Sequence, residues 1–267
     1  MNREEKIMSC VCEHLDEAKE YFNDNNIVGI FLQGSQNYNL DYEHSDIDTK
    51  LIITPSFNDI ALNRSPVSTT HIRGNDEHID FKDIRLYIDT FRKQNLNFLE
   101  ILFTDFKILN PIYEKAWNQL VQSREHIARF NPFRAVKSMK GIAEEKYHAM
   151  EHRYPSKIDI IEHYGYDCKQ LHHLLRVEDY LERYINGESY EKCLQPTDKE
   201  YLLEVKRNCY TLAEARLVAE RSIAHIRKIA DEFCDKTPNE ENKDVEELFL
   251  LVQLLIMRES VERELKL

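Results

Sequence analysis

The residues that could carry chemistry gather in one segment of the sequence, FLQGSQNYNLDYEHSDIDTKLII. An apolar run ends in Gly34-Ser35, and Asp46-Ile-Asp48 follows and leads into a second apolar run. Glycine lets the backbone approach a ligand closely, and a serine that opens a helical turn offers its hydroxyl and free N–H groups to phosphate oxygens. Asp46 and Asp48 stand two apart in an extended segment, so their side chains share a face. Two such carboxylates favour a divalent cation such as Mg²⁺ between them.

A third acidic residue follows in His78-Ile-Asp80-Phe81, where an aspartate alternates with apolar residues. A carboxylate at Asp80 could bridge a second metal ion and take the proton from an attacking hydroxyl. Asp83 competes for this role. Its position directly before Ile84 makes it the better helix N-cap, so Asp80 is preferred.

The surrounding pattern predicts an α+β fold, in which a small mixed β-sheet domain is followed by an all-helical domain. Only 6 Gly and 7 Pro in 267 residues favour long helices. Short apolar runs indicate strands, and apolar residues at helical spacing indicate helices. The predicted strands are 27–32, 48–54, 67–72 and 78–81, and the main predicted helices are 2–25, 84–93, 112–122, 133–150, 167–186, 198–207, 211–233 and 245–265. We place the two domains at residues 1–128 and 129–267.

A basic stripe lies on the predicted helix 167–186. Lys169, His173 and Arg176 are spaced i, i+4 and i+7, so they share one face of that helix. Such a face could neutralise the charge of a triphosphate. The alternative is a solvated face that pairs with the acidic residues beside it, which are Glu178, Asp179 and Glu182.

Composition limits the classes of partner. Thirty-six Lys and Arg against 48 Asp and Glu give a formal charge of −12, which argues against extended nucleic acid but leaves an RNA end open. No apolar run approaches the roughly 20 residues that span a bilayer, so no membrane partner is expected. The polar start MNREEKIMSC is unlike a secretory signal. The six cysteines show no zinc-ribbon spacing, so we expect a cytoplasmic protein with reduced thiols.

The ordered pattern of Gly-Ser, Asp-x-Asp and a third strand aspartate resembles the DNA polymerase β-like nucleotidyltransferase superfamily. Within it, the chain is similar to the YcgL-like predicted nucleotidyltransferases of bacteria and phages. The motif segment covers residues 27–81. The likeness continues through Asp83-Ile-Arg85 and Asn97–Glu100, and again through Tyr166-Asp-Cys-Lys169, His173 and Arg176.

The resemblance implies transfer of a nucleoside monophosphate from a nucleoside triphosphate to an acceptor hydroxyl, with release of pyrophosphate. The acceptor is unidentified and could be a small molecule, a protein side chain or an RNA end. The implied cofactor is Mg²⁺, or Mn²⁺ in its place. The implied catalytic and metal-binding residues are Asp46, Asp48 and Asp80. The implied nucleotide-binding residues are Gly34, Ser35, Lys169, His173 and Arg176. The alternative is a catalytically silent nucleotide-binding sensor or partner-regulating module.

Overall fold

The computed structural model of this chain describes residues 2–42, 45–74 and 76–266. It confirms the predicted α+β class, with a mixed sheet in the first half and only helices after it. Two compact units make up the chain. The first unit contains residues 1–37, 41–130 and 241–267, and the second contains residues 38–40 and 131–240.

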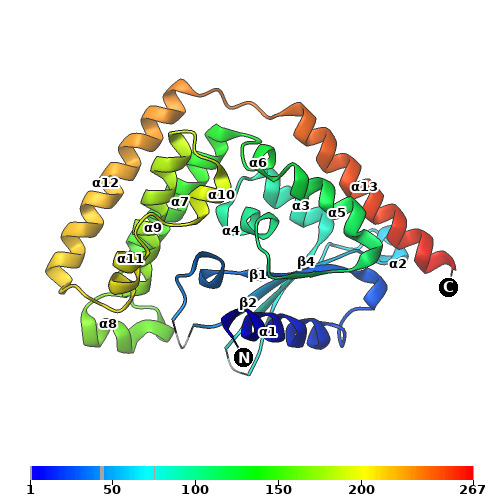
Figure 1. Cartoon of the computed structure of the whole chain (residues 1–267), viewed down its shortest axis with the longest axis horizontal. Coiled ribbons are helices and arrows are strands. Elements are labelled where there is room, and N and C mark those ends of the chain that lie inside the picture. Colours follow the sequence, from blue (N-terminus) through cyan, green and yellow to red (C-terminus); the bar gives the residue numbers. More distant parts are fainter. Residues whose placement is uncertain (1, 43–44, 75, 267) are drawn as a thin grey trace. The chain divides into compact units, whose positions relative to one another are not determined.

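The first unit is built on a β-sheet, of which β1, β2 and β4 are labelled in Figure 1. The sheet has five strands in the order β3-β4-β2-β1-β5. Strands β2 and β4 run parallel, and every other neighbouring pair is antiparallel. The strands are β1 (Ile27–Gln33), β2 (Asp48–Ile53), β3 (Ser68–Ile72), β4 (His78–Asp83) and β5 (Lys107–Leu109). All four strands predicted from the sequence are present. The three-residue strand β5 was not predicted, because a run this short shows no period.

Helix α1 (Arg3–Ala18) covers one face of the sheet. Its apolar positions Ile7 and Val11 pack on Ile30 and Leu51 in a core that excludes water almost completely. The helix begins at a capping box, in which the side chains of Asn2 and Glu5 each bond the other's backbone N–H. It ends at Ala18, seven residues before the predicted limit, because the polar cluster after Tyr21 forms a separate 3₁₀ turn.

Two helices cover the opposite face of the sheet, α3 (Ile84–Arg92) and α5 (Pro111–Gln122). The ring of Phe31 on β1 lies 4.7 Å from that of the fully buried Trp117. Asp83 is the N-cap of α3 and accepts a hydrogen bond from the Arg85 N–H. The preference for Asp83 as a cap is therefore confirmed.

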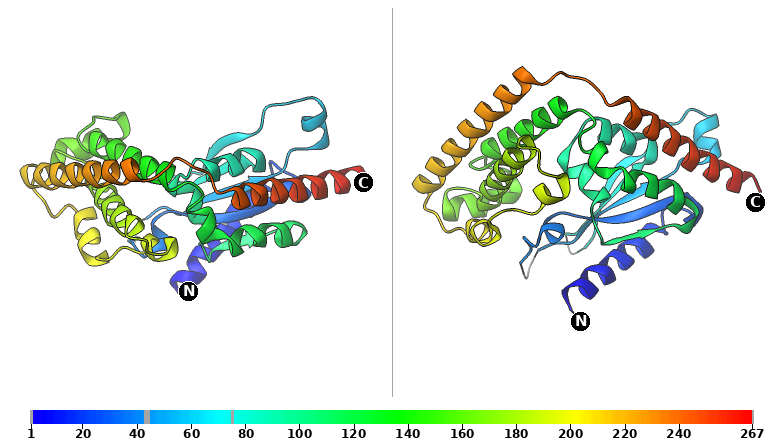
Figure 2. Two further views of the ribbon diagram at one scale, coloured as in Figure 1. Left: turned by 90° about the horizontal axis from the view of Figure 1, so that it is seen from above. Right: turned by 45° about the horizontal axis from the view of Figure 1, so that its top comes forward.

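The C-terminal helix α13 (Lys243–Lys266) also belongs to the first unit, where it runs beside α5 and α3 (Figure 2). Phe249 is fully buried, with its ring 6.1 Å from that of Phe91 and 5.4 Å from that of Phe130. The guanidinium of Arg92 pairs with Glu246 at 2.7 Å. Shorter elements complete the unit: η1 (Asp24–Asn26), η2 (Ser35–Tyr38), α2 (Phe57–Ala61), α4 (Leu96–Leu99), η3 (Glu100–Leu102) and α6 (Arg124–Ile127).

The second unit is helical, and α9 (Cys168–Ile185) is its central helix. Four helices pack around α9: α7 (Pro132–Ala149), α10 (Tyr190–Leu194), α11 (Lys199–Lys206) and α12 (Leu212–Lys236). Two further short elements are η4 (Pro155–Lys157) and α8 (Ile158–Tyr164). The core is rich in tyrosine, with Tyr180, Tyr184 and Tyr190 in mutual ring contact.

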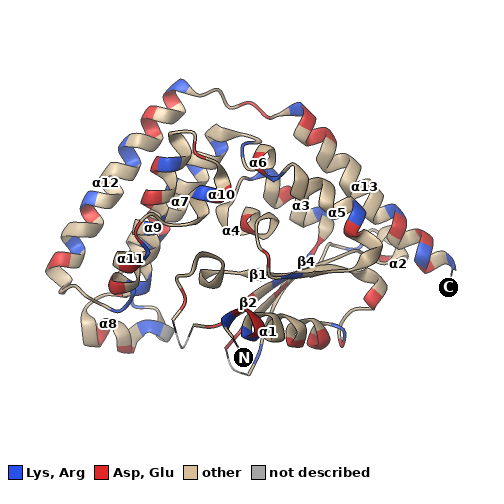
Figure 3. Ribbon diagram, viewed as in Figure 1, with Lys and Arg blue, Asp and Glu red and all other residues tan. Residues whose placement is uncertain are grey.

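The surface charge is spread over many elements. Figure 3 shows basic and acidic residues alternating along α12 and α13. Within the described part of the chain, no helix combines the length and the apolar character needed to cross a bilayer.

Candidate functional site

The Gly34-Ser35 turn lies directly after β1. Gly34 has a φ of +98°, a conformation that residues with a Cβ rarely adopt, and a Cβ there would meet no atom closer than 3.8 Å. Backbone conformation, not lack of space, therefore favours glycine. The Gly34 N–H donates to Oε1 of the buried Glu100 at 3.3 Å. The Glu100 carboxylate thus accepts a hydrogen bond from one of the N–H groups that are predicted to bind phosphate.

The turn is anchored to the loop that carries the aspartates. The side-chain amide of the buried Gln36 donates to the backbone carbonyl of Asp46. Asn37 donates to the Leu32 carbonyl at 3.1 Å and accepts from the Thr104 hydroxyl at 2.7 Å. The Gln36 contact ties the turn to the Asp46 backbone, and the Asn37 contacts tie the turn to the end of β1 and to Thr104.

Asp46 and Asp48 lie where this loop enters β2. Asp46 is exposed, and Asp48 is the first residue of the strand, opposite Gln33 of β1. One oxygen of Asp48 accepts a hydrogen bond from the His78 backbone N–H at 2.9 Å and lies 3.3 Å from His78 Nδ1. The Asp48 side chain is 34% exposed, so this carboxylate remains accessible from solvent.

Asp80 is brought to the same face of the sheet as Asp48. Strands β2 and β4 are parallel neighbours, and Lys50 stands opposite Asp80. Because side chains two apart on a strand share a face, Asp48, Lys50 and Asp80 all project from one side. The Lys50 ammonium donates to Asp80 Oδ2 at 3.2 Å, and the Thr70 hydroxyl donates to Asp80 Oδ1 at 2.6 Å.

Lys50 is the main site residue that the sequence analysis missed. Its side chain is 2% exposed, and its ammonium lies 4.3 Å from the centre of the Phe98 ring. Burial lowers the pKa of Lys50, and the charge of Asp80 opposes that shift. The period of two that aligned Asp46 with Asp48 also predicts that Lys50 faces the same way. Alternation along one strand does not report that Lys50 stands opposite Asp80 on the neighbouring strand.

The three aspartates are not assembled into one ligand set. Among the described residues, three His, Cys, Asp or Glu side chains come within mutual ligand distance only at Cys10, His14 and Glu77. Asp46 and Asp48 fit a hard cation such as Mg²⁺, because both present carboxylate oxygens that solvent can reach. The oxygens of Asp80 each accept one hydrogen bond, from Lys50 and from Thr70, and these contacts compete with a metal ion. The roles of the three aspartates stay predictions.

The predicted basic stripe lies on α9 in the second unit. Lys169 is exposed, His173 is half-buried, and the Arg176 guanidinium lies 3.6 Å from the centre of the Tyr38 ring, which belongs to the same unit. Burial lowers the pKa of His173, and the positive charges of Arg176, Lys169 and Lys146 act in the same direction. The three stripe residues are therefore close enough to interact electrostatically. Their role in nucleotide binding stays a prediction.

The neighbouring His172 has a structural role. It is buried, and its Nδ1–H donates to the Leu202 carbonyl at 2.8 Å, which ties α9 to α11. Desolvation is the largest cause that lowers its pKa, to about 4. A neutral, hydrogen-bonded histidine of this kind is part of the helical core.

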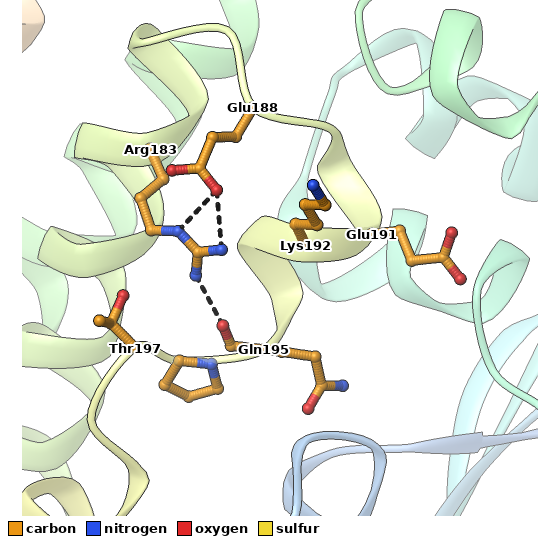
Figure 4. Close-up of a pocket in the computed structure, with 7 residues that line it drawn as sticks. Arg183, Glu188, Glu191, Lys192, Gln195 and Thr197 are labelled. Atoms are coloured by element: carbon orange, nitrogen blue, oxygen red, sulfur yellow. Dashed lines mark hydrogen bonds and ion pairs between the residues drawn. The ribbon is translucent and has the colours of Figure 1, made fainter.

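A hollow in the second unit lies beside α10 and the end of α9 (Figure 4). Arg183 lines it, and its guanidinium already donates to Glu188 Oε2 at 2.9 Å and to the Gln195 carbonyl at 2.6 Å. These contacts hold the loop before α10 and the loop after it. Arg183 therefore has a structural role, because it links the two loops that flank α10. We do not assign a functional site to this hollow.

No family model and no curated protein matches this chain. Its structure is similar to the crystal structure of a nucleotidyltransferase-like protein from Exiguobacterium sibiricum 255-15, with a TM-score of 0.34. The two chains are 9% identical, and the match covers 86% of this chain and 77% of that one. A similarity this low carries no argument about function, which must come from the residues.

Proposed function

We propose that this protein is a Mg²⁺-dependent nucleotidyltransferase that moves a nucleoside monophosphate from a nucleoside triphosphate to an acceptor hydroxyl. One observation carries the proposal. Asp48 and Asp80 project from the same face of two parallel neighbouring strands, and β1, which ends at the Gly34-Ser35 turn, pairs with the strand that carries Asp48. This order and placement fit phosphoryl chemistry at a carboxylate-lined strand edge.

In the proposed reaction, the acceptor oxygen attacks the α-phosphorus and forms a new P–O bond. The bond from the α-phosphorus to the bridging oxygen breaks, and pyrophosphate leaves with its electron pair. Asp80 takes the proton from the acceptor hydroxyl. Asp46 and Asp48 would hold Mg²⁺, which supplies neutralisation of the phosphate charge. Gly34 and Ser35 would position the β- and γ-phosphates through the backbone turn.

A second candidate is a nucleotide-binding module that no longer transfers the nucleotide. The engagement of both Asp80 oxygens, by Lys50 and Thr70, favours this alternative, because these contacts compete with a hydrogen bond from an acceptor hydroxyl. The two candidates share nucleotide binding and differ in pyrophosphate release.

Equilibrium binding of a fluorescent nucleoside triphosphate, titrated with Mg²⁺, tests the step that both candidates share. We expect binding that requires Mg²⁺ and weakens at least tenfold in Asp48→Asn. Asp235→Asn removes an exposed aspartate from α12 and serves as the matched control, with unchanged affinity expected. Binding that ignores Mg²⁺, or that Asp48→Asn leaves intact, would contradict the site.

A further inference from the structure

A second cluster of potential metal ligands lies on the α1 face of the sheet, away from Asp48 and Asp80. Cys10 and His14 stand one turn apart on α1, and Glu77 directly precedes β4. Cys10 Sγ lies 3.4 Å from His14 Nε2 and 3.5 Å from Glu77 Oε2, and His14 Nε2 lies 3.1 Å from the same oxygen. One atom from each of three different side chains thus converges on one point.

These separations match the edges of a tetrahedral zinc site. With a Zn–S distance of about 2.3 Å and Zn–N and Zn–O distances of about 2.1 Å, sulfur lies about 3.6 Å from each other ligand atom. The nitrogen and oxygen ligands then lie about 3.4 Å apart. The three observed separations fall within about 0.3 Å of these values. An ion could therefore enter with little rearrangement of the side chains.

The histidine is also oriented as a ligand would be. His14 is fully buried, and its Nδ1 lies 2.8 Å from the hydroxyl of the buried Thr49 on β2. A metal-binding histidine commonly donates its second ring N–H to an oxygen acceptor, which fixes the tautomer and turns the other nitrogen toward the ion, and the Thr49 hydroxyl can act as that acceptor. The contact with Thr49 leaves Nε2 directed at Cys10 and Glu77.

The local charge favours a cation. Three carboxylates surround the Arg73 guanidinium beside this cluster, Glu17 at 2.7 Å, Glu77 at 2.7 Å and Glu13 at 3.9 Å, and Glu17 also contacts His71 at 2.6 Å. The single positive charge of Arg73 leaves the cluster with a net negative charge. Arg73 also orients the Glu77 carboxylate through the contact with Oε2.

We propose that Cys10 Sγ, His14 Nε2 and the Glu77 carboxylate bind a thiophilic divalent cation, with Zn²⁺ as the best fit and a water molecule as fourth ligand. Thiolate, imidazole and carboxylate together are typical of zinc and not of Mg²⁺. On binding, the Cys10 thiol releases its proton to solvent. The ion joins α1 to the start of β4 and, through Thr49, to β2. The proposal does not rest on nucleotidyl transfer.

Cobalt substitution tests this site without any nucleotide. The full chain is stripped with a chelator and titrated with Co²⁺, and its absorption is recorded. We expect tetrahedral visible bands and a thiolate-to-cobalt charge-transfer band that saturate at one Co²⁺ per chain and are displaced by Zn²⁺. Cys10→Ser should lose the charge-transfer band. Cys12→Ser, which alters an exposed thiol on the same helix, should keep it.

A charge-transfer band that is absent from the wild type, or that persists in Cys10→Ser, would overturn the proposal. Circular dichroism shows whether Cys10→Ser folds. X-ray absorption of the zinc-loaded wild type gives a test that needs no variant. One sulfur among the zinc ligands supports the site, and a shell of nitrogen and oxygen alone contradicts it.

Discussion

At the scale of single residues, the pair formed by Lys50 and Asp80 decides how the candidate site can be tested. Lys50 is buried, while Asp80 is 30% exposed. Removing one partner from a buried pair leaves the other charge uncompensated, which costs more than the pair itself contributes. A loss of activity in an Asp80 variant would therefore mix chemistry with stability. Asp46 is exposed and forms no such pair with Lys50, so it gives a cleaner test of the chemistry.

We predict that Asp80→Asn lowers the free energy of unfolding by about 2 kcal/mol, because it leaves the Lys50 ammonium buried without its carboxylate. Adding Lys50→Met should restore most of this loss. Asp46→Asn, at an exposed position, should cost less than about 0.5 kcal/mol. Urea unfolding of the four proteins measures these differences. Equal stability of wild type and Asp80→Asn would show that the ion pair does not matter.

The two glycines Gly34 and Gly141 should respond to alanine with opposite signs. At Gly34 the positive φ penalises a Cβ, so Gly34→Ala should lower the free energy of unfolding by about 1–2 kcal/mol. Gly141 lies exposed inside α7 with open space around it, so Gly141→Ala should raise stability by about 0.5–1 kcal/mol. Thermal and urea unfolding measure the stability change of each variant. Changes of the same sign would contradict the backbone argument.

At the scale of elements, the long helices and the strands whose apolar residues are regularly spaced can be predicted from the sequence. The shared face of Asp48 and Lys50 follows from alternation along β2. Strand β5 and the pairing of β2 with β4 could not be derived this way. Both depend on contacts between segments distant in sequence, which periodicity does not report. The contact of Glu100 with the Gly34 N–H is hidden for the same reason.

The apolar residues of α13 differ in burial and should therefore differ in their contribution to stability. Phe249 is fully buried against Phe91 and Phe130, whereas Leu254 is 68% exposed. Phe249→Ala should lower the free energy of unfolding by about 3–5 kcal/mol, because it removes buried area and leaves a cavity. Leu254→Ala should change it by less than about 0.5 kcal/mol. Chemical denaturation of both variants measures these changes. Equal effects would contradict the burial of Phe249 and the exposure of Leu254.

At the scale of the whole molecule, the chain consists of two compact units, and the last helix has its contacts in the first of them. The division predicted from the sequence, at residue 128, stays a prediction. Sequence pattern reports that residues 243–266 are helical and cannot report which unit they pack against. Apolar residues of α13 occur on several sides of the helix, both buried and exposed. The sequence pattern therefore does not show which side of the helix packs against the rest of the chain.

Buried histidine makes the stability of the molecule depend on pH. His172 has a pKa of about 4 in the folded chain, against 6.5 for an ordinary histidine. Its stabilising contribution is therefore complete above pH 6.5 and is lost as the pH falls toward 4. Between pH 7.5 and pH 5, the wild type should lose about 2 kcal/mol more than His172→Asn. Urea unfolding at both pH values measures this, and identical losses in the two proteins would contradict it.

The central claim, nucleotidyl transfer at Asp46, Asp48 and Asp80, is tested most directly by pyrophosphate release from each of the four nucleoside triphosphates in the presence of Mg²⁺. We predict release by the wild type that stops on metal removal and falls at least a hundredfold in Asp46→Asn/Asp48→Asn, while the circular dichroism spectrum stays unchanged. Full activity in the double variant would contradict this assignment. Mg²⁺-dependent binding without release, even with a broad set of acceptors, would instead favour the silent nucleotide-binding module.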